Sequence, residues 1–284
     1  MIRRHRQQGF TFIELVIVIT ILGVLAGILT PFIQHATTAY AQSRIRNTLL
    51  TIGDLSLERM TRSIRQAVPN SITVLNGDQG IEFLHARTGG RYVDQFDNFG
   101  AAFADPAARL AKATPVDRIY ILGTGLSKNT GDVLVIGNTA PSELTTGSSG
   151  SAVALNTVLP TAALPWPLGD GTDQGQIMIL SGNHAFPIDS PGRHFLIADR
   201  TIEIGKSGTT LRWHSNSGLN DLDADTDWSG SDPILVDQVR SIHFSFQPGT
   251  PRATGVVRID LELADAGDNE SLRLYREVHI RNTP

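Results

Sequence analysis

The chain has 284 residues, a formal net charge of −4 and no cysteine. Because cysteine is absent, disulfide frameworks and thiolate metal sites are excluded. The slight acidic excess, with 28 Asp and Glu against 24 Lys and Arg, argues against a protein that coats nucleic acid.

The N-terminus divides into a short basic segment and a long apolar one. Residues 1–9, MIRRHRQQG, carry three arginines and no acid, whereas residues 10–33 contain a single charged side chain, Glu14. At about 1.5 Å per residue, a helix over residues 10–33 would cross the roughly 30 Å hydrocarbon layer of a membrane. Since arginines stay on the cytoplasmic side, we expect the rest of the chain on the opposite side.

Glu14 is costly in such a segment, because a carboxylate inside the hydrocarbon layer costs roughly 2.5–3.5 kcal/mol. In an ordinary membrane anchor, the side chain would extend to the headgroups.

The residues around Glu14 favour another interpretation. Gly9 is followed by FTFIELVIVITILGVLAGI, in which Glu14 is the fifth residue after the glycine. This arrangement resembles the type IV prepilin family, which includes the pseudopilins of type II secretion. The resemblance implies that prepilin peptidase cleaves between Gly9 and Phe10, that Phe10 is N-methylated, and that Glu14 pairs with the terminal amine of a neighbouring subunit.

The same resemblance implies partners and a location. The expected partners are prepilin peptidase, other major and minor pilins, and an inner-membrane assembly platform. The chain is expected to cross the inner membrane once, with its N-terminus cytoplasmic and its globular domain periplasmic, and then to enter a pilus or pseudopilus.

The pattern over residues 34–68 predicts that the helix continues past Pro31 as an amphipathic segment. Apolar residues recur at three- and four-residue spacing, at Leu57, Met60, Ile64 and Val68. Glu58 and Arg62 form an i,i+4 pair on another face. The prolyl turn PNS at residues 69–71 predicts the end of the helix.

Residues 69–284 read as strands and turns. We therefore predict an α+β pilin fold, with a long helix packed on a large antiparallel β domain. Period-two alternation is clearest over residues 240–246, 256–264 and 271–280, and it predicts a sheet whose buried face lies on the amphipathic helix. Segments 138–151 and 167–175 are rich in Thr, Ser, Gly and Pro and predict surface loops. Further strands are expected at 71–75, 81–85, 117–123, 132–138, 176–180, 194–199, 200–205 and 209–214.

Later segments narrow the resemblance. VDRIYILGTG, LVDQVRSIHFSFQPGTPRATGVVRIDLELA and EVHIRNTP resemble the large J-type minor prepilins, and among these the minor prepilins of the MSHA pilus. This implies a minor subunit that joins a filament or primes its assembly. The alternative is a tip adhesin whose loops at 138–175 and 212–232 bind a glycan or a surface.

The acidic segment NDLDADTDWSGSD, residues 220–232, is the candidate metal site. Its alternating carboxylates could converge on a hard cation such as Ca²⁺, and they belong to Asp221, Asp223, Asp225 and Asp227. The segment departs from an EF-hand loop, because Thr226 stands where glycine is required and Asp232 where glutamate is required. The alternative is a solvated acidic turn.

No catalytic motif stands out, so we expect no enzyme activity. IGKSG at residues 204–208 lacks the first glycine of a phosphate-binding loop, because Arg200 occupies that position, and it is expected to form a hairpin turn. Arg59, Arg62 and Arg65 lie on a helix interleaved with acids, which is typical of a solvated face rather than a nucleic-acid site.

Overall fold

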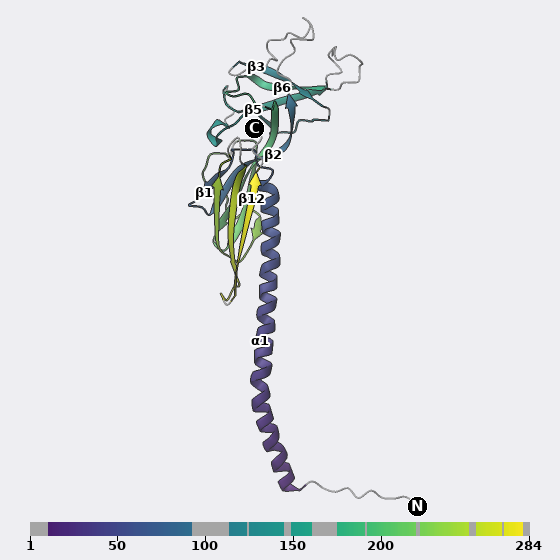
Figure 1. Ribbon diagram of the computed structural model, residues 1–284, viewed down its shortest axis with the longest axis vertical. Helices are drawn as coiled ribbons and strands as arrows, with labels where there is room; N and C mark the ends of the chain where they lie inside the picture. Colours follow the sequence, from purple (N-terminus) through teal and green to yellow (C-terminus); the bar gives the residue numbers. More distant parts are fainter. Residues whose placement is uncertain are drawn as a thin grey trace, which may run out of the picture.

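The computed structural model describes residues 11–92, 114–123, 125–144, 149–160, 175–190, 192–219, 222–249, 254–268 and 270–280. A single long helix carries a β-rich domain beside and beyond its C-terminal end (Figure 1). The predicted α+β fold, a long helix followed by a large antiparallel β domain, is confirmed. The expected leader, residues 1–9, lies outside the described residues.

The domain is built from antiparallel strands. They are β1 (Thr73–Leu75), β2 (Gly80–Tyr92), β3 (Val116–Leu122), β4 (Val133–Val135), β5 (Ala152–Pro160), β6 (Gly175–His184), β7 (His194–Ser207), β8 (Thr210–Ser217), β9 (Ile234–Val236), β10 (Val239–Gln247), β11 (Gly255–Ala264) and β12 (Ser271–Ile280). Strand β7 joins two segments that the sequence predicts as separate strands. In the tip-adhesin alternative, the description of 138–175 as loop is wrong for β5, and that of 212–232 is wrong for its first residues, which belong to β8.

Helix α1 (Phe12–Ile64) has 53 residues and is therefore about 80 Å long. It continues through Pro31, as predicted. It ends four residues earlier than the predicted limit at Val68, because the following main chain pairs with β2 instead. Val68 N–H donates to the Leu84 carbonyl over 2.7 Å, and Ala86 N–H donates to the Gln66 carbonyl over 2.7 Å.

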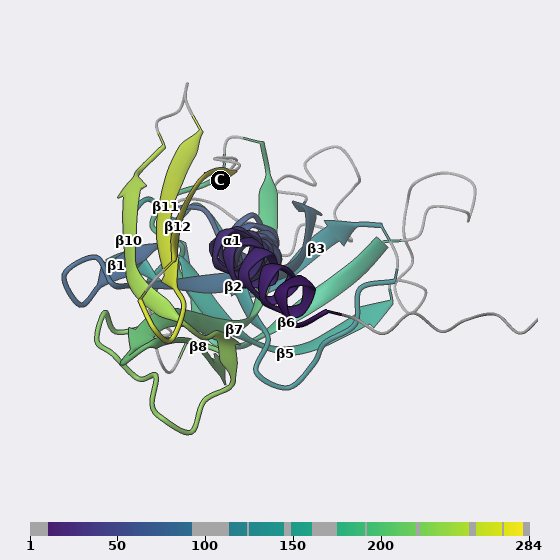
Figure 2. The ribbon, with the colours of Figure 1, turned by 90° about the horizontal axis from the view of Figure 1, so that it is seen from below.

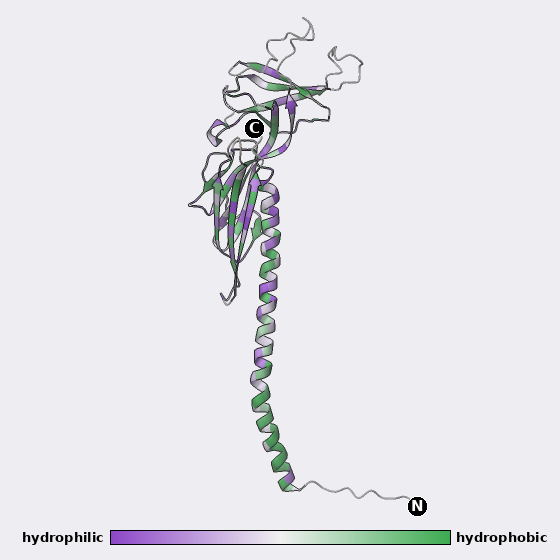
Figure 3. Ribbon diagram, viewed as in Figure 1, coloured by the Kyte–Doolittle hydropathy of each residue, from purple (hydrophilic) through white to green (hydrophobic). Residues whose placement is uncertain are grey.

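The two halves of α1 differ in what covers them. Every residue from Phe12 to Arg44 is exposed, and the apolar ones gather in the N-terminal half (Figure 3). The buried residues begin at Leu49 and include Leu57, Met60 and Ile64. The domain thus covers the C-terminal part of the helix and leaves the apolar part uncovered.

Strands β2 and β7 are the longest antiparallel pair, and they connect two parts of the domain. At one end, β2, β3, β6, β5, β4 and β7 are hydrogen-bonded in this order, and β7 pairs back with β2. These six strands therefore close into a ring, which lies beyond the C-terminal end of α1 (Figure 1). At the other end, β1, β8 and β9 extend the β2–β7 pair into an open sheet.

Each part has its own hydrophobic core. The ring encloses a core that includes Ile119, Leu134 and Phe186. The other core lies between α1, the open sheet and the separate β10–β11–β12 sheet, which flank the helix when viewed along it (Figure 2). Alternate residues of β11 face this core and are fully buried, namely Val257, Ile259, Leu261 and Leu263. The prediction that the last three strands pack on the amphipathic helix is confirmed.

We expect Met60→Ala to lower the free energy of unfolding by about 3 kcal/mol, because Met60 is fully buried between helix and sheets. The matched control is Leu55→Ala, since Leu55 lies on the same helix but is 71% exposed; it should change stability by less than about 0.5 kcal/mol. Urea unfolding of the full chain in detergent measures both. Equal losses for the two variants would contradict this packing of the helix.

Candidate functional site

The N-terminal end of α1 places Glu14 in a capping box. Thr11 is the N-cap residue, and its hydroxyl oxygen accepts from Glu14 N–H over 3.4 Å. In return, Thr11 N–H donates to Glu14 Oε2 over 3.5 Å. The carboxylate is thereby turned back toward the start of the helix, next to the predicted cleavage position. Gly9 and Phe10 themselves lie outside the described residues.

The apolar half of α1 presents a continuous uncovered surface. Large apolar side chains are exposed along its length, with Phe12 at 82%, Ile28 at 66% and Phe32 at 72%. Within the described part of the chain, α1 is the one helix long and apolar enough to cross a membrane. An apolar surface of this extent requires a membrane or other protein surfaces to cover it.

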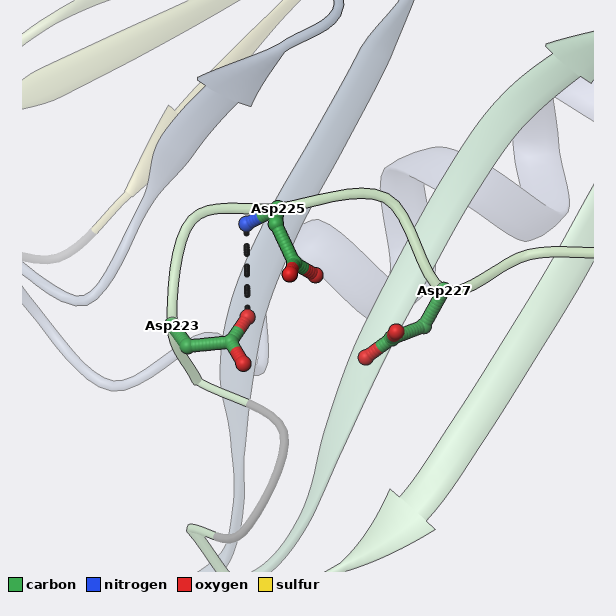
Figure 4. Close-up of side chains that lie close together, drawn as sticks. All are labelled: Asp223, Asp225 and Asp227. Atoms are coloured by element: carbon green, nitrogen blue, oxygen red, sulfur yellow. Dashed lines mark hydrogen bonds between the residues drawn. The ribbon is translucent and has the colours of Figure 1, made fainter.

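The structure brings together three of the four predicted metal ligands. Asp223, Asp225 and Asp227 lie in the loop between β8 and β9, and one carboxylate oxygen from each lies within 4.8 Å of the others (Figure 4). Asp225 N–H donates to Asp223 Oδ1 over 3.3 Å, which holds this part of the loop in a turn. Asp221 lies outside the described residues.

Two buried carboxylates lie under this loop. Glu82 on β2 and Glu203 on β7 are direct cross-strand partners, and their exposed fractions are 1% and 0%. The main-chain N–H groups of Asp223 and Ala224 hydrogen-bond to Glu82. Asp227 N–H donates to Glu203 Oε2 over 3.0 Å. The two glutamates therefore hold the acidic loop against the sheet.

Glu82 is in an unusual electrostatic environment. Burial is the main cause that raises its pKa from the ordinary value of 4.5 to about 7, and the neighbouring charge of Glu203 adds to this. The hydrogen bonds from Asp223 and Ala224 act in the opposite direction. Its Oε1 atom is buried and has no hydrogen-bond partner among the described residues.

Trp228 fixes the other end of the loop. Gly80 and Gly205 are cross-strand partners on β2 and β7, and the indole lies against both. A Cβ atom added at Gly205 would lie 2.2 Å from the ring, and one added at Gly80 would lie 2.3 Å from it. The indole N–H also donates to the Lys206 carbonyl over 3.3 Å. The two glycines are therefore required for the close approach of the ring.

Sequence reasoning missed Glu82 and Glu203. Each interrupts an apolar run, in IEFLH and in RTIEIG, and alternation alone would assign it to a solvated face. In the structure both faces of these strand segments are buried, since residues 80–84 and 201–205 are all inaccessible. The sequence did contain one signal for their burial, because Glu82 and Glu203 each stand between two large apolar residues.

Residues 4–30 match the family model of the prokaryotic N-terminal methylation motif. The matched segment contains Gly9, Phe10 and Glu14, and it supports a type IV pilin-like or pseudopilin protein that prepilin peptidase processes. Together with the apolar half of α1, it supports a protein anchored in the membrane by a single span. No curated protein and no solved structure matches the chain.

The raised pKa of Glu82 predicts a pH-dependent stability. Between about pH 4.5 and pH 7 the unfolded chain loses the proton that folded Glu82 keeps, so the free energy of unfolding should fall with rising pH, by up to about 3 kcal/mol. We expect Glu82→Gln to lose this fall, because an amide does not titrate. Unfolding of the full chain at several pH values, in buffer free of divalent cations, measures it.

The control for this comparison is Glu58→Gln on the exposed face of α1, where Glu58 is paired with Arg62 over 3.8 Å. This variant should keep the wild-type fall in stability. If Glu82→Gln and the wild type show the same pH profile between pH 4.5 and 7, the burial of an ionisable Glu82 is not the cause.

Proposed function

We propose that this chain is a minor subunit of a type IV pilus or a related filament, and that it joins the filament or primes its assembly. One observation carries the proposal: an uncovered apolar helical segment, Phe12–Ile33, begins with a carboxylate at Glu14 inside a prepilin-type motif. The proposal assigns the chain a role in assembly rather than in catalysis.

The apolar half of α1 would serve in two environments. The membrane covers it before assembly, and the helices of neighbouring subunits cover it afterwards. In both environments the burial of Glu14 is unfavourable, since a lone buried carboxylate costs several kcal/mol. We propose that the terminal amine of a neighbouring subunit, freed by cleavage before Phe10, supplies the opposite charge. The capping box supports this role, because it turns the carboxylate toward the helix end.

The size of the domain supports the role of a minor subunit rather than that of the major subunit, which repeats along the filament. The six-stranded ring is added to the part that packs on α1, and it extends beyond the helix end (Figure 1). A bulky extension along the filament axis is easier to accommodate at a tip, or in an initiation complex with other minor pilins, than in every subunit. The resemblance to J-type minor prepilins, and to those of the MSHA pilus in particular, agrees with this proposal.

A tip adhesin is the second candidate function. The ring lies at the end of the molecule farthest from the apolar half of α1, so it would be outermost at a filament tip (Figure 1). Its surface carries the exposed apolar side chains of Leu159 and Ile188.

Removing the chain from cells distinguishes the assembly role from the adhesin role. Loss of filaments supports assembly, whereas normal filaments with lost attachment support adhesion.

We expect Glu14→Ala and Glu14→Gln to be cleaved normally but to enter filaments at least about tenfold less than the wild type, because either change leaves the neighbouring amine unpaired in an apolar environment. Immunoblots of sheared filaments, normalised to the major subunit, measure incorporation. The two variants differ in one respect: glutamine at this position can still complete the capping box, and alanine cannot.

This difference makes the experiment decisive. If Glu14→Gln enters filaments normally and Glu14→Ala does not, Glu14 acts as a helix cap and the proposed ion pair is wrong. Glu58→Gln is the control, because it removes one negative charge from the exposed face of the same helix. It should be incorporated like the wild type.

A further inference from the structure

We propose that α1 binds an acidic surface of a neighbouring pilin-type subunit through the face that it exposes beside the domain. The proposal rests on the proposed function, because it needs other filament subunits as neighbours. The exposed side chains recur at spacings of three, four or seven residues, which places them on the side of the helix opposite the buried Leu57, Met60 and Ile64. This basic face is made up of Arg44, Thr51, Leu55, Glu58, Arg62 and Arg65.

The arginines of the basic face lack strong counter-charges. Among the described residues, neither Arg44 nor Arg65 has an ion-pair partner. Arg62 lies 3.8 Å from Glu58, but this pair is exposed and contributes little. The arginines on the outer face of the β10–β11–β12 sheet are instead paired with acids, namely Arg240 with Glu262, Arg258 with Glu277 and Arg273 with Asp260. The domain thus neutralises this sheet and leaves the charge of the helix for a partner.

Leu55 gives the basic face an apolar centre. Its side chain is 71% exposed, whereas that of Leu57 is buried. One turn further along, Arg59 is already positioned, since its guanidinium lies 4.9 Å from the centre of the Trp213 ring. An exposed apolar residue among arginines has the composition of a protein interface, because arginine is enriched there and the apolar centre loses its water on binding. The basic face therefore suits a protein partner.

The basic face lies too far from the membrane to bind lipid headgroups. The apolar segment ends at Ile33. In a helix that crosses the membrane upright, Arg44 lies about 16 Å beyond that residue and Arg62 about 44 Å beyond it. The headgroup layer on each side of the hydrocarbon is only roughly 5–8 Å thick. Anionic lipids are therefore out of reach.

A nucleic acid also fits the basic face poorly. Residues 69–284 carry 25 Asp and Glu against 16 Lys and Arg. A long polyanion bound along α1 would therefore run beside a domain whose net charge has the same sign. A folded subunit presents its acids as a discrete patch, which can meet the arginines without following the rest of the domain.

The basic face is continuous with the surface that neighbouring subunits would cover. Every residue of α1 from Phe12 to Arg44 is exposed, so nothing in the described part of the chain separates the apolar half from Arg44 and Leu55. A subunit that packs along the apolar half is therefore placed to reach the basic face as well. Because a minor subunit is rare in a filament, that neighbour is a different subunit rather than a second copy of this chain.

The test is photo-crosslinking in native cells with p-benzoylphenylalanine in place of Leu55. We expect an adduct with another pilin-type subunit, and mass spectrometry should locate the attachment beside Asp or Glu residues. The control position is Tyr275, which is 58% exposed on the outer face of β12, where the neighbouring arginines are paired. The same probe at Tyr275 should give at least about tenfold less adduct.

Charge reversal tests whether the contact is electrostatic. Arg62→Glu and Arg44→Glu should each lower the adduct from position 55 at least about tenfold, because each places like charges opposite one another. Lys128→Glu is the matched control, since Lys128 is exposed in the loop between β3 and β4 and undergoes the same change of charge. It should leave the adduct unchanged. Melting temperatures in detergent, expected within about 2 °C of the wild type, check that the variants fold.

The outcomes separate this proposal from the proposed function. No adduct from position 55, equal adducts from both positions, or no effect of either charge reversal would each overturn the proposal. An adduct with lipid, with nucleic acid or with a second copy of this chain would do the same. In each of these cases a chain that is found in sheared filaments still supports the proposed function. Retention of residues 1–9, by contrast, would contradict the proposed function itself.

Discussion

The apolar surface of α1 must be covered along its whole length, and the protein itself covers only the C-terminal part. There, Leu49, Leu57, Met60 and Ile64 are buried against strands of both sheets. From Phe12 to Ile33 no part of the chain that the structure describes covers the helix. This asymmetry sets the architecture, because the domain must pack beside one half of the helix and leave the other half free for a membrane or for neighbouring helices.

The β2–β7 pair is the second element on which the molecule depends. Along one stretch it contributes to the core against α1, and further along it closes the six-stranded ring. On the opposite face of the stretch that packs toward α1, its cross-strand glutamates and glycines hold the acidic loop. A change in this strand pair would therefore act on the helix packing, the ring and the loop together, and variants there are poor tests of any one role.

Much of this could be predicted from the sequence where the signal is local. The N-terminal motif, the amphipathic spacing of Leu57, Met60 and Ile64, and the alternation in β11 each depend on neighbouring residues. The features that could not be predicted depend on residues that lie far apart in the sequence. The helix ends at Ile64 because β2 pairs with residues 66–68, and the ring exists because β7 returns to β2 after more than a hundred residues. Burial of Glu82 and Glu203 likewise results from a loop distant in sequence.

Processing of the N-terminus tests the central claim most directly. Surface filaments sheared from native cells can be searched by mass spectrometry for the N-terminal peptide of this chain. A filament subunit should yield a peptide that begins with N-methylated Phe10, at a small fraction of the major subunit. A chain that keeps residues 1–9 attached and occurs only in the cell envelope would contradict the account and leave a membrane-anchored β domain.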